Sequence, residues 1–143
     1  MKRERTDVLR SHQVSVGQAP VSFIAVAEDG TAVGGPVGLT LVGFFCAGCP
    51  ACSARIAPFT AYVRANRIAR DDVLTILLLG DEGPPPYLDR LAEVALVSVQ
   101  PPGNLIGEAF GVDGYPAFCL LDGVGTVVAT GADPAALPAP LTA

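Results

Sequence analysis

The chain has 143 residues, of which 50% are apolar and 16% are charged. This length suits one domain, and the apolar fraction is enough for a buried core, so a disordered chain is excluded. Nine basic against fourteen acidic residues give a formal net charge of −5. Because phosphate neutralisation needs a dense basic surface, this charge excludes a generic nucleic-acid-binding protein.

Basic residues are concentrated at the N-terminus, where Lys2 is the only lysine and His12 the only histidine of the chain. We therefore predict a basic tail over residues 1–13 and a single domain over residues 14–143. Because that domain lacks histidine and lysine, it cannot use a Ser-His-Asp triad, a Schiff-base lysine or a histidine-ligated metal.

The chain as given shows no export signal, because the charged N-terminus has no apolar segment of the kind found in signal peptides. Residues 31–54 are free of charge and long enough for a membrane-spanning helix. Their glycines and cysteines favour a buried strand followed by a turn instead. The basic tail fits either a free terminus or the flank of a membrane anchor upstream of Lys2.

The first half of the domain predicts a β-hairpin, a strand and a helix. Residues 21–27 and 32–33 form the two arms of the hairpin around a Glu-Asp-Gly-Thr turn. Residues 39–45 are an apolar strand that ends at a cluster of cysteines. Residues 50–69 have helical periodicity. The apolar face of this helix is formed by Ile56, Phe59, Tyr62 and Val63.

In the second half, buried strands alternate with short helices and a hairpin comes last. The strands are predicted at residues 73–79, 94–99, 117–121 and 126–130, and the helices at 87–93 and at 104–110, where Asn104 is the N-cap. This order predicts an α/β domain of three layers around a mixed sheet, with an N-terminal β-hairpin added.

Four cysteines, at positions 46, 49, 52 and 119, are the residues best suited to chemistry. Cys49-Pro50-Ala51-Cys52 is a C-x-x-C motif at the start of a predicted helix. There the free N–H groups of the first turn stabilise a thiolate, so we predict Cys49 as the nucleophile and Cys52 as the resolving thiol. Pro50 suits the opening turn because it lacks an N–H group.

Other uses of these cysteines remain open. A zinc site would need four ligands, and the C-x-x-C-x-x-C run ending at Cys52 has Ile56 where an iron–sulfur cluster would need another cysteine. Cys46 and Cys119 lie in apolar strands and are interpreted as buried thiols. Alternatively, Cys46 is a second resolving thiol, or it pairs with Cys119 where the two strands are neighbours.

Three segments together resemble the thioredoxin-fold superfamily, in particular the TlpA/ResA-like thiol–disulfide oxidoreductases. They are VGQAPVSFIAVAEDGTAV, TLVGFFCAGCPAC and GVDGYPAFCLLDGVGTVVATG, and the resemblance spans about residues 14–131. It implies a cis peptide bond between Tyr115 and Pro116, packed against the dithiol, and a substrate-binding surface around it. The resemblance differs at Gly48, where thioredoxins have tryptophan, and at Gly43, where they have a buried aspartate.

The resemblance implies a thiol–disulfide oxidoreductase without a cofactor or metal. Its catalytic pair would be Cys49 and Cys52, its substrate a protein thiol or disulfide, and its other partner a redox protein. We expect substrate contacts from Pro50, Ala51, Tyr115 and Pro116, and a monomer. Relatives of this kind are mostly membrane-anchored and extracytoplasmic.

The missing aspartate at Gly43 leaves the proton acceptor for Cys52 unassigned, and Glu108 and Asp113 are the candidates. The same gap motivates an alternative function, a redox-silent thioredoxin-fold module that only binds or scaffolds proteins. A thiol peroxidase is less well supported, because the sequence lacks the P-x-x-x-T-x-x-C arrangement around a peroxidatic cysteine.

Overall fold

The computed structural model describes residues 15–101 and 105–140. Two predicted features lie outside these residues: the basic tail over residues 1–13 and the N-cap at Asn104. Within the described residues, no helix has the length and hydropathy needed to cross a bilayer.

A mixed five-stranded sheet forms the middle layer, in the order β5-β4-β3-β6-β7. Strand β3 lies at its centre, parallel to β4 and antiparallel to β6. The outer strand β5 runs parallel to β4, and β7 runs antiparallel to β6. The strands are β3 (Leu41–Cys46), β4 (Val73–Leu78), β5 (Leu96–Gln100), β6 (Ala117–Leu121) and β7 (Val127–Gly131).

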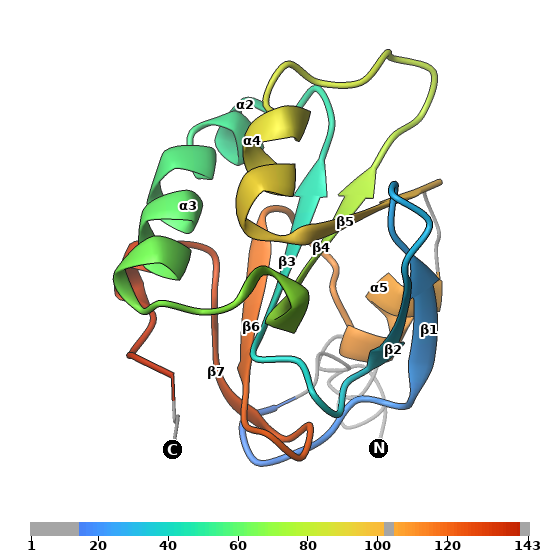
Figure 1. The fold of residues 1–143 in the computed structure, drawn as a ribbon. Coiled ribbons are helices and arrows are strands. Elements are labelled where there is room, and N and C mark those ends of the chain that lie inside the picture. Colours follow the sequence, from blue (N-terminus) through green and yellow to red (C-terminus); the bar gives the residue numbers. More distant parts are fainter. Residues whose placement is uncertain (1–14, 102–104, 141–143) are drawn as a thin grey trace, which may run out of the picture.

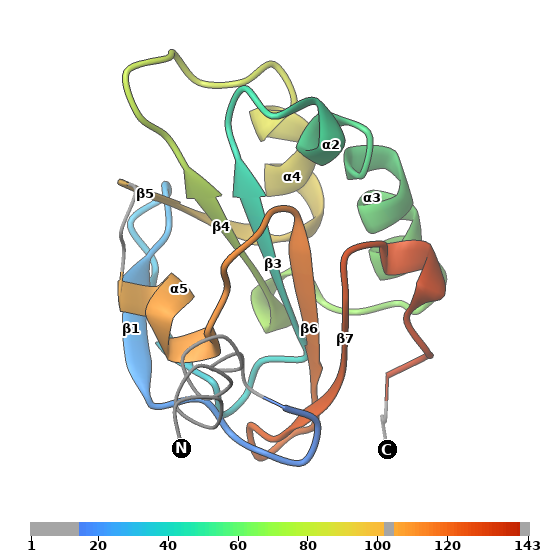
Figure 2. The ribbon, with the colours of Figure 1, turned by 180° about the vertical axis from the view of Figure 1, so that it is seen from behind.

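Helices α2 (Pro50–Ser53), α3 (Ile56–Ala65) and α4 (Leu88–Val94) lie on one side of this sheet. The other side carries α5 (Leu105–Phe110) and a separate hairpin of β1 (Phe23–Val26) and β2 (Ala32–Gly35), as Figure 1 and the reverse view in Figure 2 show. Two short 3₁₀ helices, Arg70–Asp72 and Pro134–Ala136, complete the described elements. The predicted three-layer fold with an added hairpin is confirmed.

Each face of the sheet has its own aromatic core. On the side of α3, the rings of Phe45, Phe59 and Phe118 lie 5.5–5.6 Å apart, and Cys52 and Tyr87 belong to the same buried cluster. We call this cluster the cysteine-side core. The hairpin-side core lies on the opposite face and contains Phe44, Phe110 and Cys119.

The predicted single helix over residues 50–69 is wrong, because the chain forms two helices with a break at Ala54 and Arg55. Pro58 has no N–H to donate to the carbonyl of Ala54, so a continuous helix cannot form across this point. The N–H of Arg55 bonds instead to the carbonyl of Cys52, which tightens the end of α2. The break leaves α2 as a short turn that holds the C-x-x-C motif, while α3 buries the predicted apolar face.

Candidate active site

Three of the four cysteines meet at the carboxyl end of the central strand. Cys46 is the last residue of β3, Cys49 is the N-cap of α2, and Cys52 lies within α2. The N–H of Cys49 bonds to the carbonyl of Cys46 at 3.3 Å, which closes the turn between strand and helix. Gly48 stands in this turn with a φ of +81°, a left-handed conformation that favours glycine. The tryptophan of thioredoxins would therefore be strained at this position.

Cys49 is half-buried and its sulfur faces the amide groups of α2. The nearby backbone N–H groups of Cys52 and Ala51 and the Cys52 thiol lower the pKa of Cys49 below 9.0, with the Cys52 N–H as the largest cause. The adjacent Pro50 and Ala51 are exposed. The Cys49 thiol therefore combines a lowered pKa with access to solvent.

Cys52 has the opposite environment, with a side chain that is 0% exposed. Burial raises the pKa of its thiol to about 12. The backbone N–H of Cys46 donates to Cys52 Sγ at 3.3 Å and partly counters this shift. The pKa of Cys46 is also raised, first by burial and then by the nearby Cys49 thiolate. The site thus pairs a thiol of lowered pKa, Cys49, with a buried thiol of raised pKa, Cys52.

We expect this difference to govern alkylation of the reduced protein. Iodoacetamide reacts with thiolates, so Cys49 should be labelled first as the pH rises, with a midpoint below 9.0. Cys52 and Cys119, whose pKa values burial raises to about 12, should be labelled last in the folded protein. Peptide mass spectrometry after timed labelling measures the order, and labelling of Cys52 ahead of Cys49 would contradict it.

Cys119 lies on the other face of the sheet, in the hairpin-side core. Its strand β6 does neighbour β3, but Cys119 is opposite Val42, four residues before Cys46. Four residues of strand span about 13 Å. Because a disulfide needs Cα atoms roughly 4.4–6.8 Å apart, the pairing of Cys46 with Cys119 is excluded. All four cysteines are free thiols in this structure.

The segment before β6 supplies the second part of the site. The Tyr115–Pro116 peptide bond is cis, Pro116 is buried and Tyr115 is half-buried. After burial, the charge on Cys46 is the largest cause of the raised pKa of Tyr115, and Cys52 also contributes, so the phenol lies near the cysteines.

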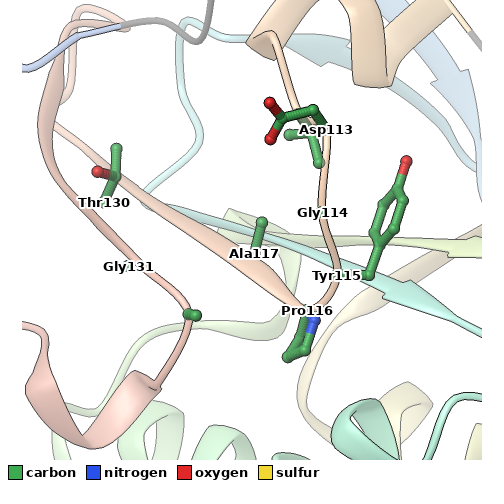
Figure 3. A pocket seen from close by; sticks show the side chains of 9 residues that line it. Asp113, Gly114, Tyr115, Pro116, Ala117, Thr130 and Gly131 are labelled. Atoms are coloured by element: carbon green, nitrogen blue, oxygen red, sulfur yellow. The ribbon is translucent and has the colours of Figure 1, made fainter. Parts of the chain in front are cut away.

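A groove of about 390 Å³ runs along this segment, between residues 112–117 and residues 130–132. Figure 3 shows that the Asp113 side chain and the Tyr115 ring leave the segment on opposite sides, with Asp113 on the side of Thr130. The cysteine cluster and the groove therefore flank the Tyr115–Pro116 segment.

Neither carboxylate predicted as a proton acceptor reaches Cys52. Glu108 is on α5, on the opposite face of the sheet, where it lines a groove with residues of β1. Asp113 is exposed, and its charge acts on Tyr115 but on none of the cysteines. Both predictions are wrong, because α5 holds Glu108 on the opposite face of the sheet and the segment after α5 directs Asp113 toward the side of Thr130.

At Gly43, the position where thioredoxins have a buried aspartate, this chain has no room for a side chain. A Cβ built on Gly43 would lie 3.2 Å from the Phe59 ring and 3.3 Å from the Phe118 ring. These distances are tighter than ordinary van der Waals contact, so the two aromatic rings occupy the space of the acid. The floor of the site below Cys52 is therefore apolar.

Tyr87 is a residue near the cysteines that the sequence analysis did not single out. It is the N-cap of α4 and belongs to the cysteine-side core with Cys52. Burial raises its pKa to about 12, and the next causes are the charges of Cys52, Cys46 and Cys49. The sequence did hold one indication of this position. The predicted strand over residues 73–79 is parallel to the strand before the C-x-x-C motif, so the loop that follows it begins at the same edge of the sheet.

Within residues 15–101 and 105–140, no group of three or more His, Cys, Asp or Glu side chains has the arrangement of a metal site.

No protein-family model matches the sequence, and no curated protein matches it either. Solved structures do match. A candidate thiol:disulfide interchange protein DsbE from Chlorobium tepidum has a TM-score of 0.59 at 22% identity, over 82% of this chain and 85% of that one. An exposed lipoprotein thioredoxin from Streptococcus pneumoniae has a TM-score of 0.54 at 24% identity, over 78% and 88%.

A third structure, a thiol:disulfide interchange protein from Bacteroides sp., has a TM-score of 0.62 at 17% identity and covers 85% of both chains. These proteins share the mixed sheet with helices on its faces that carries the cysteine cluster here. The chain therefore has the thioredoxin-like fold of thiol:disulfide interchange proteins.

Proposed function

We propose that the protein is a thiol–disulfide oxidoreductase that works through Cys49 and Cys52. The asymmetry of the pair is the observation that carries this proposal. Cys49 is accessible and its pKa is lowered, whereas Cys52 is buried and its pKa is raised to about 12. Exchange enzymes need this division between an attacking and a resolving sulfur.

In the reducing direction, the Cys49 thiolate attacks a disulfide of the partner protein. A mixed disulfide forms between Cys49 and one partner sulfur, and the other partner sulfur leaves as a thiolate. Cys52 then loses its proton and attacks Cys49 Sγ. The Cys49–Cys52 bond forms, and the second partner sulfur leaves with the electron pair and takes up a proton from solvent.

The partner is a protein with an apolar, extended segment. Pro50 and Ala51 are exposed next to Cys49, and they carry no charge. Tyr115 and Pro116 separate the cysteines from the groove that they line, so we assign substrate contacts to these four residues. A second redox protein, not a cofactor, would restore the oxidised or reduced pair.

We assign these roles to a monomeric domain over residues 14–143. The Streptococcus pneumoniae protein of the same fold is named an exposed lipoprotein. That name, and the persistence of disulfides in oxidising compartments, support an extracytoplasmic setting.

A redox titration with mass-spectrometric counting of alkylated cysteines tests the pair. In dithiothreitol or glutathione buffers we expect one cooperative two-thiol step that is confined to Cys49 and Cys52. The reduction potential at the midpoint of this step distinguishes a reductant, at about −270 mV, from an oxidant, at about −120 mV. If no pair titrated, the protein would be a thioredoxin-fold binding module instead.

Trapping the intermediate tests the order of attack. Cys52→Ser removes the resolving thiol, so a partner should accumulate as a mixed disulfide at Cys49. The trapped species should disappear on treatment with dithiothreitol and should be absent from the Cys49→Ser/Cys52→Ser double variant. Partner bound equally to the double variant would contradict the assigned nucleophile.

A further inference from the structure

Tyr87 is a buried residue whose polar atom has no partner. Its side chain is only 6% exposed, and its hydroxyl makes no hydrogen bond. A buried hydroxyl without a partner costs stability, because it has lost its hydrogen bonds to water. We therefore looked for a partner that the Tyr87 hydroxyl would gain in another state of the protein.

Among residues 15–101 and 105–140, the other buried hydroxyls on this face of the sheet are all bonded. Thr60 donates to the carbonyl of Ala57, and Thr75 donates to the carbonyl of Leu96. Tyr62, in the same core as Tyr87, donates to the carbonyl of Pro138. Tyr87 differs from them, so its free hydroxyl is not a general property of this core.

The surroundings of Tyr87 point to Cys52 as the missing partner. Both side chains are buried in the cysteine-side core, and the Tyr87 ring packs against Phe45 with centroids 6.4 Å apart. Helices α2 and α4 lie on the same side of the sheet, near the carboxyl end of β3, in both Figure 1 and Figure 2. Among the cysteine charges that act on the phenol, that of Cys52 is the largest.

Within the part of the chain that the structure describes, the donor that bonds to Cys52 Sγ is the backbone N–H of Cys46, at 3.3 Å. No acid stands at Gly43, where Phe59 and Phe118 fill the space. When Cys52 ionises, its sulfur can accept further hydrogen bonds. The apolar side chains below it have no groups to donate them.

We propose that the Tyr87 hydroxyl donates a hydrogen bond to Cys52 Sγ when that sulfur becomes a thiolate, and so lowers the barrier to resolution of the mixed disulfide. This inference rests on the proposed function of the Cys49–Cys52 pair. Cys52 Sγ attacks Cys49 Sγ, the bond from Cys49 to the partner sulfur breaks, and the partner sulfur leaves with the electron pair. The proton of Cys52 passes to solvent and balances the proton that the released partner thiolate takes up. Tyr87 keeps its own proton throughout.

The test is stopped-flow reaction of the reduced protein with dithiobis-nitrobenzoate, in a Cys46→Ser background that leaves Cys52 to resolve. The first release of coloured thiolate depends on reagent concentration and reports attack by Cys49. The second release is intramolecular and reports attack by Cys52. Tyr87→Phe should slow the second phase by about 10- to 100-fold, the effect of one hydrogen bond to a charged sulfur. The first phase should not change.

The pH profile separates this role from a structural one. The inflection of the second phase should move upward in Tyr87→Phe, because the Cys52 thiolate loses a donor. Tyr62→Phe is the matched control, since it also removes one phenol hydroxyl from the same core, and it should leave both phases and the profile unchanged. The melting temperature of Tyr87→Phe should equal or exceed that of its parent, because the lost hydroxyl had no partner.

Two results would overturn the inference, and they can be told apart. If Tyr87→Phe had the parent's second phase and pH profile, Tyr87 would have no part in resolution, although exchange through the pair would stand. If the second phase were absent while Tyr87 was intact, Cys52 would not resolve the mixed disulfide. In that case the proposed exchange would fail, together with the role of Tyr87.

Discussion

Replacement of Cys49 with serine is expected to abolish disulfide reduction, with a loss on the order of 10³-fold or more. The hydroxyl of serine does not ionise near neutral pH, whereas the amide groups of α2 lower the pKa of the Cys49 thiol. Turnover of insulin in the presence of dithiothreitol measures the effect. The variant should remain folded, because Cys49 is half-buried and its own N–H bond to Cys46 is retained.

Cys119→Ala is the matched control for this experiment. Cys119 is buried on the opposite face of the sheet and has no contact with the cluster, so its removal should leave the turnover within about twofold of the parent once folding is verified. Equal turnover by Cys49→Ser and the parent would mean that another thiol, or a contaminant, reduces insulin.

Gly43→Asp is expected to destabilise the fold by about 3–5 kcal/mol, even though it places an acid where thioredoxins have one. The new Cβ would lie 3.2 Å from the Phe59 ring and 3.3 Å from the Phe118 ring, so these rings must move. The carboxyl group would also be buried among the apolar side chains of the cysteine-side core. Denaturant unfolding followed by circular dichroism measures the loss.

Gly43→Ala separates the two causes, since it adds the Cβ without the carboxyl group. We expect a cost of about 1–3 kcal/mol from overpacking alone. A Gly43→Asp variant as stable as the parent, with faster resolution by Cys52, would show that the aromatic rings make way for an acid. In that case the assignment of an apolar floor would be wrong.

Residues 73–79 show why most of the fold could be predicted. An almost wholly apolar run of strand length between two polar loops is typical of a strand covered on both faces, and the structure places Val73–Leu78 between β3 and β5. The break between α2 and α3 could not be read from apolar periodicity, which continues through it. The break depends on the N–H that Pro58 lacks and on the bond from the Arg55 N–H to the Cys52 carbonyl, which ends α2 after one turn.

The candidate site was predictable only where it is local in sequence. The C-x-x-C spacing and its place after a strand identify Cys49 and Cys52, because both sulfurs belong to one turn of chain. Tyr87 comes from a helix that follows the next strand, and its approach to Cys52 depends on the packing of α4 against the sheet. Cys46 was interpreted as a buried thiol, but it is half-buried, and its backbone N–H contacts Cys52 Sγ.

Because Cys119 is buried in the hairpin-side core, its reactivity reports when that core opens to solvent. Its side chain is covered in the hairpin-side core, and its strand is bonded on both sides, to β3 and to β7. A thiol reagent can reach it when the layer of α5 and the β1–β2 hairpin opens away from the sheet. Pulsed labelling of Cys119 in native buffer would therefore yield the free energy of that opening without denaturant. The same sample can report redox chemistry at Cys49 and opening of the hairpin-side core at Cys119.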